Sequence, residues 1–134
     1  EKRKMKRISS YSGDALVSID DVTTGPDDYQ GRHTIIVTIT WVNQSEANEP
    51  LSNAAKLTVT QDGSQLEMNY YTEPPLPQGY ENMSFSRSVQ PGVLAKATVS
   101  YVVEDPGQPV TVRLSSTYGS NDMVTKKMTP RKVE

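Results

Sequence analysis

Apolar and polar positions alternate with a period of two along most of this chain. The clearest case is residues 33–43, where Ile35, Val37, Ile39 and Trp41 fall on one side of an extended strand. This period, carried by β-branched and aromatic residues, is typical of a strand in a pleated sheet. We therefore predict that the segment is a central strand with Trp41 in the core.

Six other segments alternate in a similar way, and none shows convincing helical periodicity. Turn-forming residues separate the segments, and residues 73–79 are predicted to be a loop because their three prolines cannot donate to a sheet ladder. Seven short strands joined by turns predict an all-β fold, a two-sheet antiparallel sandwich. The six further strands are predicted at 15–20, 55–60, 65–71, 83–89, 93–103 and 110–115.

The length of 134 residues indicates one domain. We expect a flexible basic lead-in at residues 1–12, the sandwich at 13–118 and a C-terminal tail at 119–134. The net charge is only −2, but positive residues are concentrated at the two ends of the chain, so the body between them is acidic. An acidic body disfavours nucleic acid as a partner, since a phosphate backbone is bound by Lys and Arg.

The chain has no Cys, which excludes a thiolate nucleophile and a thiolate metal site. This composition fits a cytosolic protein, and it equally fits an exported protein of a Gram-positive bacterium. No apolar run approaches the roughly 18 residues of a membrane span. Because the chain starts at Glu1 in a charged run, we expect an upstream segment to precede it.

Short motifs follow one another in a characteristic order between residues 14 and 117. They are Asp27–Gly31, Trp41-Val42-Asn43 with Ser45, Gln61-Asp62-Gly63, Pro91-Gly92, Glu104-Asp105-Pro106 and Pro109–Val112. In this order they resemble the immunoglobulin-like extracellular domains of unknown function in lipoproteins and secreted proteins of Gram-positive bacteria. Those domains are related in fold to a mycobacterial secreted immunogenic protein family.

This resemblance implies an immunoglobulin-like sandwich, export, and attachment through a lipid-modified Cys upstream of Glu1. It implies no established activity. We therefore expect a non-enzymatic interaction or spacer domain outside the cell or at its surface, in contact with a membrane only through the upstream anchor. Two alternatives are a carboxylate-based hydrolase and an adhesion or chaperone-like sandwich whose free edge binds a partner strand.

Few residues carry catalytic chemistry. His33 is the only His, and no neighbour in sequence orients it, so we predict a surface residue rather than a catalytic base. Three acidic pairs, Asp20-Asp21, Asp27-Asp28 and Glu104-Asp105, are consistent with a Ca²⁺ site, but they lack Asp-x-Asp-x-Asp spacing and fit turns better. We predict no catalytic residue, no metal site and no cofactor.

The best candidate binding surface combines three tyrosines with a proline-rich loop. Tyr70, Tyr71 and Tyr80 would supply contact area at low entropic cost, and Pro75 and Pro77 would order the loop beforehand. Such a surface suits a protein, a peptide or a glycan at the cell surface. In the alternative interpretation, the tyrosines close the edge of the sandwich and the prolines prevent edge-strand pairing.

Overall fold

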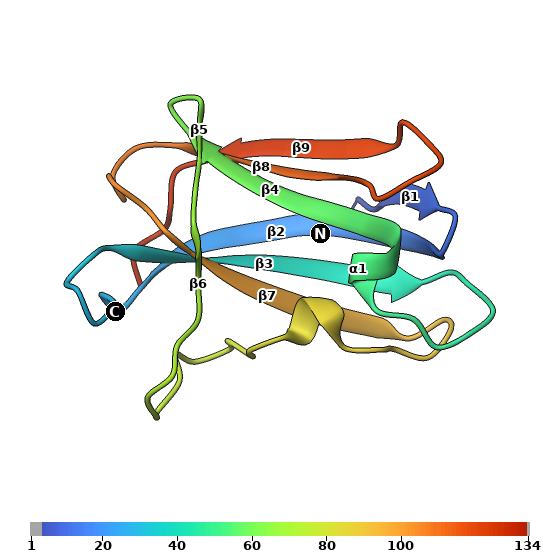
Figure 1. Cartoon of the computed structure of the whole chain (residues 1–134), viewed down its shortest axis with the longest axis horizontal. Helices are drawn as coiled ribbons and strands as arrows, with labels where there is room; N and C mark the ends of the chain where they lie inside the picture. The colour runs from blue at the N-terminus through green and yellow to red at the C-terminus, as the bar shows by residue number, and fades with distance from the viewer. Residues whose placement is uncertain (1–3, 134) are drawn as a thin grey trace.

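The computed structural model describes residues 4–133, which form two antiparallel sheets packed against each other (Figure 1). The five-stranded sheet has the order β1 (Lys6–Ser10), β2 (Gly13–Gly25), β3 (Thr34–Asn43), β7 (Leu94–Val102) and β6 (Met68–Asn69). The four-stranded sheet has the order β5 (Ser64–Gln65), β4 (Ala55–Gln61), β8 (Val110–Ser116) and β9 (Met123–Met128). The predicted all-β two-sheet sandwich is confirmed.

Alternate residues of each strand fill the space between the sheets. In β3, which pairs with β2 on one side and β7 on the other, Ile35, Val37 and Ile39 are fully buried and Trp41 is 1% exposed. The apolar residues of β8 face them from the opposite sheet and belong to the same core cluster. Trp41 is therefore a core residue, as its alternating strand predicts.

Within residues 4–133 both ends of the chain belong to the sandwich, so the lead-in predicted at 1–12 and the tail predicted at 119–134 are wrong there, while residues 1–3 and 134 lie outside the described residues. β1 pairs with β2, and its Ile8 is fully buried. β9 pairs with β8, and Asp122 just before it accepts hydrogen bonds from the backbone N–H and the hydroxyl of Ser9, at 3.0 and 3.1 Å. Each of these strands pairs with the strand next to it in the chain, and the hydrogen bonds between Ser9 and Asp122 join the two ends across the sequence.

Two of the predicted strands differ in the structure. The segment at 65–71 is divided, because β5 stays beside β4 while β6 joins the other sheet, and the chain between them crosses from sheet to sheet (Figure 1). The segment at 83–89 contains a single 3₁₀ turn, η1 (Ser84–Ser86), instead of a strand. There the Ser84 Oγ accepts a hydrogen bond from the Thr98 N–H at 2.8 Å. A side-chain oxygen thus takes the β7 backbone donor that a neighbouring strand would otherwise bind.

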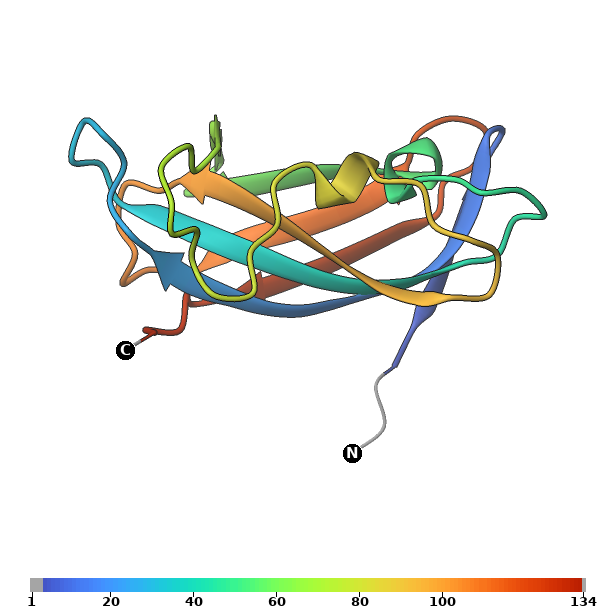
Figure 2. The ribbon, with the colours of Figure 1, turned by 90° about the horizontal axis from the view of Figure 1, so that it is seen from below.

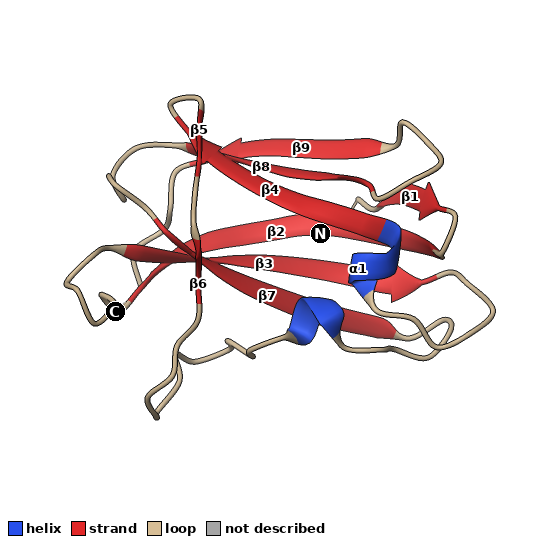
Figure 3. Ribbon diagram, viewed as in Figure 1, coloured by secondary structure: helices blue, strands red, loops and turns tan. Residues whose placement is uncertain are grey.

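The two long sides of the sandwich differ. On one side, residues after β9 continue along β2, where the Arg131 N–H donates to the Val22 carbonyl at 2.8 Å. On the other side, between β4 and β7, the structure places two short helical turns, α1 (Leu51–Ala54) and η1 (Figures 2 and 3). Within residues 4–133, no helix has the length and apolar character needed to cross a membrane.

Candidate functional site

The structure separates the members of the predicted tyrosine surface. Tyr71 and Tyr80 are only 8% and 7% exposed, and they pack with Ile36 in a small second core on the outer face of the five-stranded sheet. Their rings meet edge to face with centroids 4.9 Å apart. The two rings therefore expose little contact area, because Ile36 provides an apolar surface for them to cover, and this burial favours the alternative interpretation that they close the edge of the sandwich.

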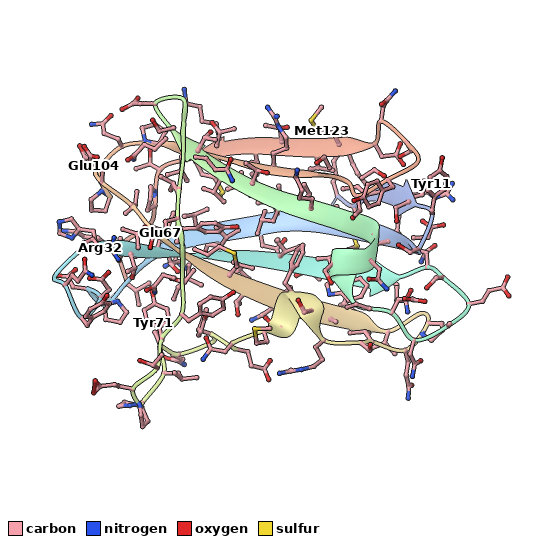
Figure 4. All side chains as sticks on the ribbon, in the orientation of Figure 1. Tyr11, Arg32, Glu67, Tyr71, Glu104 and Met123 are labelled. Atoms are coloured by element: carbon pink, nitrogen blue, oxygen red, sulfur yellow. The ribbon has the colours of Figure 1, made fainter. Side chains whose placement is uncertain are left out.

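Tyr71 has a structural role that its hydrogen bonds explain (Figure 4). Its hydroxyl lies 2.6 Å from the Thr34 Oγ1 and accepts from the Ser100 Oγ at 3.0 Å. Gly25 provides the necessary space, since a Cβ atom there would lie 2.2 Å from the Tyr71 hydroxyl. The segment after β6 is thereby hydrogen-bonded to β3 and β7 and lies against Gly25 of β2.

The remaining members of the predicted surface are more accessible. Tyr70 is 50% exposed and Pro75 is exposed. Pro77 is half-buried, and its carbonyl accepts a hydrogen bond from the Tyr80 N–H at 3.1 Å. Of these three residues, only Tyr70 lines the cavity described next.

An apolar cleft of about 320 Å³ lies on the side of the sandwich where α1 and η1 are found. Its walls come from β4, β6, β7 and the segment around η1, so both sheets contribute to it. The volume is at the small end of the ~300–1,000 Å³ typical of ligand sites. The lining residues are Ser52, Ala55, Lys56, Leu57, Met68, Asn69, Tyr70, Tyr80, Met83, Phe85, Ser86, Thr98, Val99, Tyr101 and Thr117.

Three large apolar side chains at this cleft are exposed to solvent. Met68, Tyr70 and Met83 are 48%, 50% and 60% exposed. Met83 also holds a left-handed backbone conformation, with φ of 65°, directly before η1. Exposed apolar side chains that gather around a cavity are typical of interaction sites, and Met adapts its shape easily to a bound group.

Three of the polar groups at the cleft are the phenols of Tyr70, Tyr80 and Tyr101. Burial raises the pKa of Tyr80 to about 12, with smaller contributions from Tyr71 and Tyr70, and burial also raises the pKa of Tyr101. Within residues 4–133, the hydroxyls of Tyr70, Tyr80 and Tyr101 form no hydrogen bond. The cleft can therefore surround an apolar group and offer neutral hydroxyls to its polar atoms.

Asp28 and Asp21, one residue from each of two acidic pairs, form ion pairs with arginines. Asp28 binds the Arg32 guanidinium at 2.7 Å. Burial raises the pKa of the Asp28 carboxyl, but the hydrogen bonds from Arg32 and Gln30 together lower it by more, so its pKa lies below the ordinary value. Asp21 binds Arg131, also at 2.7 Å. In the part of the chain that the structure describes, no three or more His, Cys, Asp or Glu residues are grouped as metal ligands.

His33 lies at the surface, as predicted. Its Nδ1 is 3.3 Å from the Asp27 Oδ1, and both side chains are more than half exposed. Neither residue lines the cleft. The structure therefore does not bring the single imidazole together with the candidate binding residues.

Sequence reasoning missed most of the cleft, including Leu57, Met83 and Phe85. One signal was available, because the alternation over 83–89 places Arg87 on the same face as apolar residues. A charged residue on an apolar face conflicts with a core strand. In the structure Arg87 is exposed and binds Glu81 at 2.7 Å, while Phe85 faces the cleft.

Comparison with known proteins gives one family and one similar fold. A family model described as "Domain of unknown function (DUF5067)" matches residues 2–116. The solved "Structure of a putative lipoprotein from Staphylococcus aureus subsp. aureus NCTC 8325" is similar, with a TM-score of 0.64 and 10% sequence identity over 98% of this chain and 100% of that one. At this identity the likeness shows the fold alone. No curated protein matches the chain.

Proposed function

The chain belongs to the DUF5067 family, and from its open cleft and the fold that it shares with a putative lipoprotein we propose that it is a non-enzymatic binding domain of an exported or lipid-anchored bacterial protein. The domain would act outside the membrane by holding an apolar group of a partner in the cleft. The observation that carries this proposal is the cleft itself, an apolar cavity between the two sheets with exposed Met and Tyr side chains around it.

The composition of the cleft supports binding rather than catalysis. No Asp, Glu or His is among the residues that line it. The phenol of Tyr80 has a pKa raised to about 12, so it stays protonated near neutral pH and is a poor general base there. An apolar lining with a few polar groups that fix orientation is the usual arrangement of a binding pocket.

The extracellular part of the proposal rests on other support. The name of the staphylococcal structure, which shares the fold over its full length, refers to a lipoprotein. The absence of Cys from all 134 residues is compatible with export from a bacterium that uses few disulfides. Expression of the complete gene product, followed by protease treatment of intact cells, tests this part: the domain should be digested from outside, and full protection would contradict export.

Binding at the cleft is tested with a neutral apolar dye such as Nile red. The wild-type domain should enhance the dye's fluorescence in a saturable way. Met83→Glu places a charge at the cleft and should weaken dye binding at least fivefold. Leu94→Glu is the matched control, because Leu94 has a similar exposure of 58% but does not line the cleft. An equal effect of the two substitutions would contradict the proposed site.

A further inference from the structure

We infer that the group held in the cleft belongs to an extended peptide of a partner protein, which pairs with β4 as an added strand. This inference rests on the proposed function and names the class of partner. Apolar side chains of the peptide would enter the cleft, and its backbone would hydrogen-bond to the free edge of β4. Such strand addition obtains affinity from the backbone and selectivity from alternate side chains.

The first support is the free backbone edge of β4. This strand pairs with β8 from Ala55 to Thr60, whereas on its other side β5 pairs only with Thr60 and Gln61. The Leu66 N–H donates to the Val59 carbonyl at 2.8 Å, so Val59 directs its backbone groups away from β8.

The same alternation applies two residues earlier in β4. Because backbone groups alternate along an antiparallel strand, Leu57 directs its N–H and C=O to the same side as Val59. Among residues 4–133, no strand pairs with Leu57 on that side. These two groups are therefore available to the backbone of another chain.

The second support is that the cleft lies along this edge. Three consecutive residues, Ala55, Lys56 and Leu57, line it. Successive side chains of a strand point to opposite faces, so a ligand that contacts three in a row touches the edge of the strand rather than one face. A molecule in the cleft would therefore lie beside the unpaired backbone of Leu57.

The third support is the size of the cleft. At the ~30 Å³ that one water occupies in the liquid, a cavity of about 320 Å³ accommodates about ten non-hydrogen atoms. Two medium apolar side chains match this size, and alternate residues of one strand would present them on the same face. The exposed Met68, Tyr70 and Met83 side chains would cover them from outside.

Charge complementarity specifies the residue between those two side chains. β4, β8 and β9 contain no Asp or Glu, and their outward-facing cations Lys56, Arg113 and Lys127 are exposed and form no ion pair with any residue among 4–133. An added strand would extend this basic face beside Lys56. Because opposite charges on neighbouring strands attract, the partner peptide should carry an acidic residue between two apolar ones.

A displayed library of random heptapeptides, selected on the full chain, tests the sequence preference. Recovered peptides should share an acidic residue flanked on both sides by apolar residues. Lys56→Glu should change the preferred central residue from acidic to Lys or Arg. Lys96→Glu is the control, since Lys96 is exposed on β7 but does not line the cleft, and it should leave the preference unchanged. Recovery of no common sequence would overturn the inference.

Backbone N-methylation of a selected peptide tests strand pairing without altering the protein. Methylation should weaken binding at least tenfold at alternate peptide residues, which face β4, and should be tolerated at the residues between them. A uniform response would overturn strand addition. If Nile red binds as expected but no peptide competes with it, the inference fails and the proposed apolar site remains; if the dye does not bind, the proposed function fails.

Discussion

Tyr71 and Tyr80 offer a matched test of how the segment after β6 is held in place. Both rings are buried to a similar extent and contact each other, but only Tyr71 has a hydrogen-bonded hydroxyl. The substitution Tyr→Phe at each position removes a single oxygen and keeps the ring. A difference between the two variants therefore measures the hydrogen bonds of Tyr71.

The expected magnitude follows from the partners. Tyr71→Phe loses the contacts with the Thr34 and Ser100 hydroxyls, which retain the carbonyls of Pro26 and Ile35 as acceptors. No donor is left unpaired, so each lost bond costs about 0.5–1 kcal/mol and the total loss is about 1–2 kcal/mol. For 134 residues at about 2.1 cal/mol/K each, the Tm should fall by about 4–7 °C.

Tyr80→Phe should change the free energy of unfolding by less than about 0.5 kcal/mol, because its hydroxyl has no partner to lose. Urea unfolding followed by the fluorescence of Trp41, the single tryptophan, measures both variants, and an unchanged m-value makes the comparison valid. Equal destabilisation by the two substitutions would refute the hydrogen-bond explanation.

Three further predictions concern other parts of the molecule. Gly13→Ala should destabilise the fold by about 1–3 kcal/mol in the same urea assay, because the new Cβ would lie 2.8 Å from the Ala54 backbone nitrogen. Gly107→Ala is the control and should have little effect, because its Cβ would meet only the Asp105 side chain, at 3.3 Å. The raised pKa of Tyr80 means that folding favours its neutral phenol, so the contribution of this group to stability is present below pH 10 and lost as the pH rises toward 12. Tyr80→Phe should therefore reduce the fall in unfolding free energy between pH 10 and 12. Tyr29→Phe, at an exposed position, should leave that fall unchanged. Hydrogen bonds from the backbone N–H and then the hydroxyl of Ser9 lower the pKa of Asp122, so its contribution to stability is present above pH 4 and lost as the pH falls below 4. Asp122→Asn should make the unfolding free energy depend less on pH in this acid range and should increase amide hydrogen exchange in β1. Unchanged exchange in β1 would contradict the role of Asp122 in holding that strand.

Local pattern predicted the strands whose own residues determine their burial. β3, β4, β7 and β8 lie close to their predicted ranges, because alternating apolar residues bury one face wherever the strand is placed. β1 and β9 could not be predicted in this way. Ser9 and Asp122 are 113 residues apart, and nothing in either short basic segment indicates that the other will lie beside it.

The candidate site shows the same limit. Of the tyrosines selected from the sequence, Tyr70 and Tyr80 line the cleft, but Tyr71 and Tyr80 are buried because they cover Ile36 from a different strand. Leu57 and Met83 belong to segments with no local sign of a shared cavity. Their common role depends on where β4 and η1 lie after folding.

The amino-acid sequence by itself therefore determined the all-β class, the central strand at residues 34–43 and the buried position of Trp41, since the period of two and β-branched side chains act locally. Only the tertiary structure decided that β6 leaves β5 to join the other sheet, which tyrosines are buried and where the cleft lies. β6, the buried tyrosines and the cleft depend on backbone edges and surfaces that meet across long sequence separations, and a local pattern carries no information about which distant segment will cover an edge.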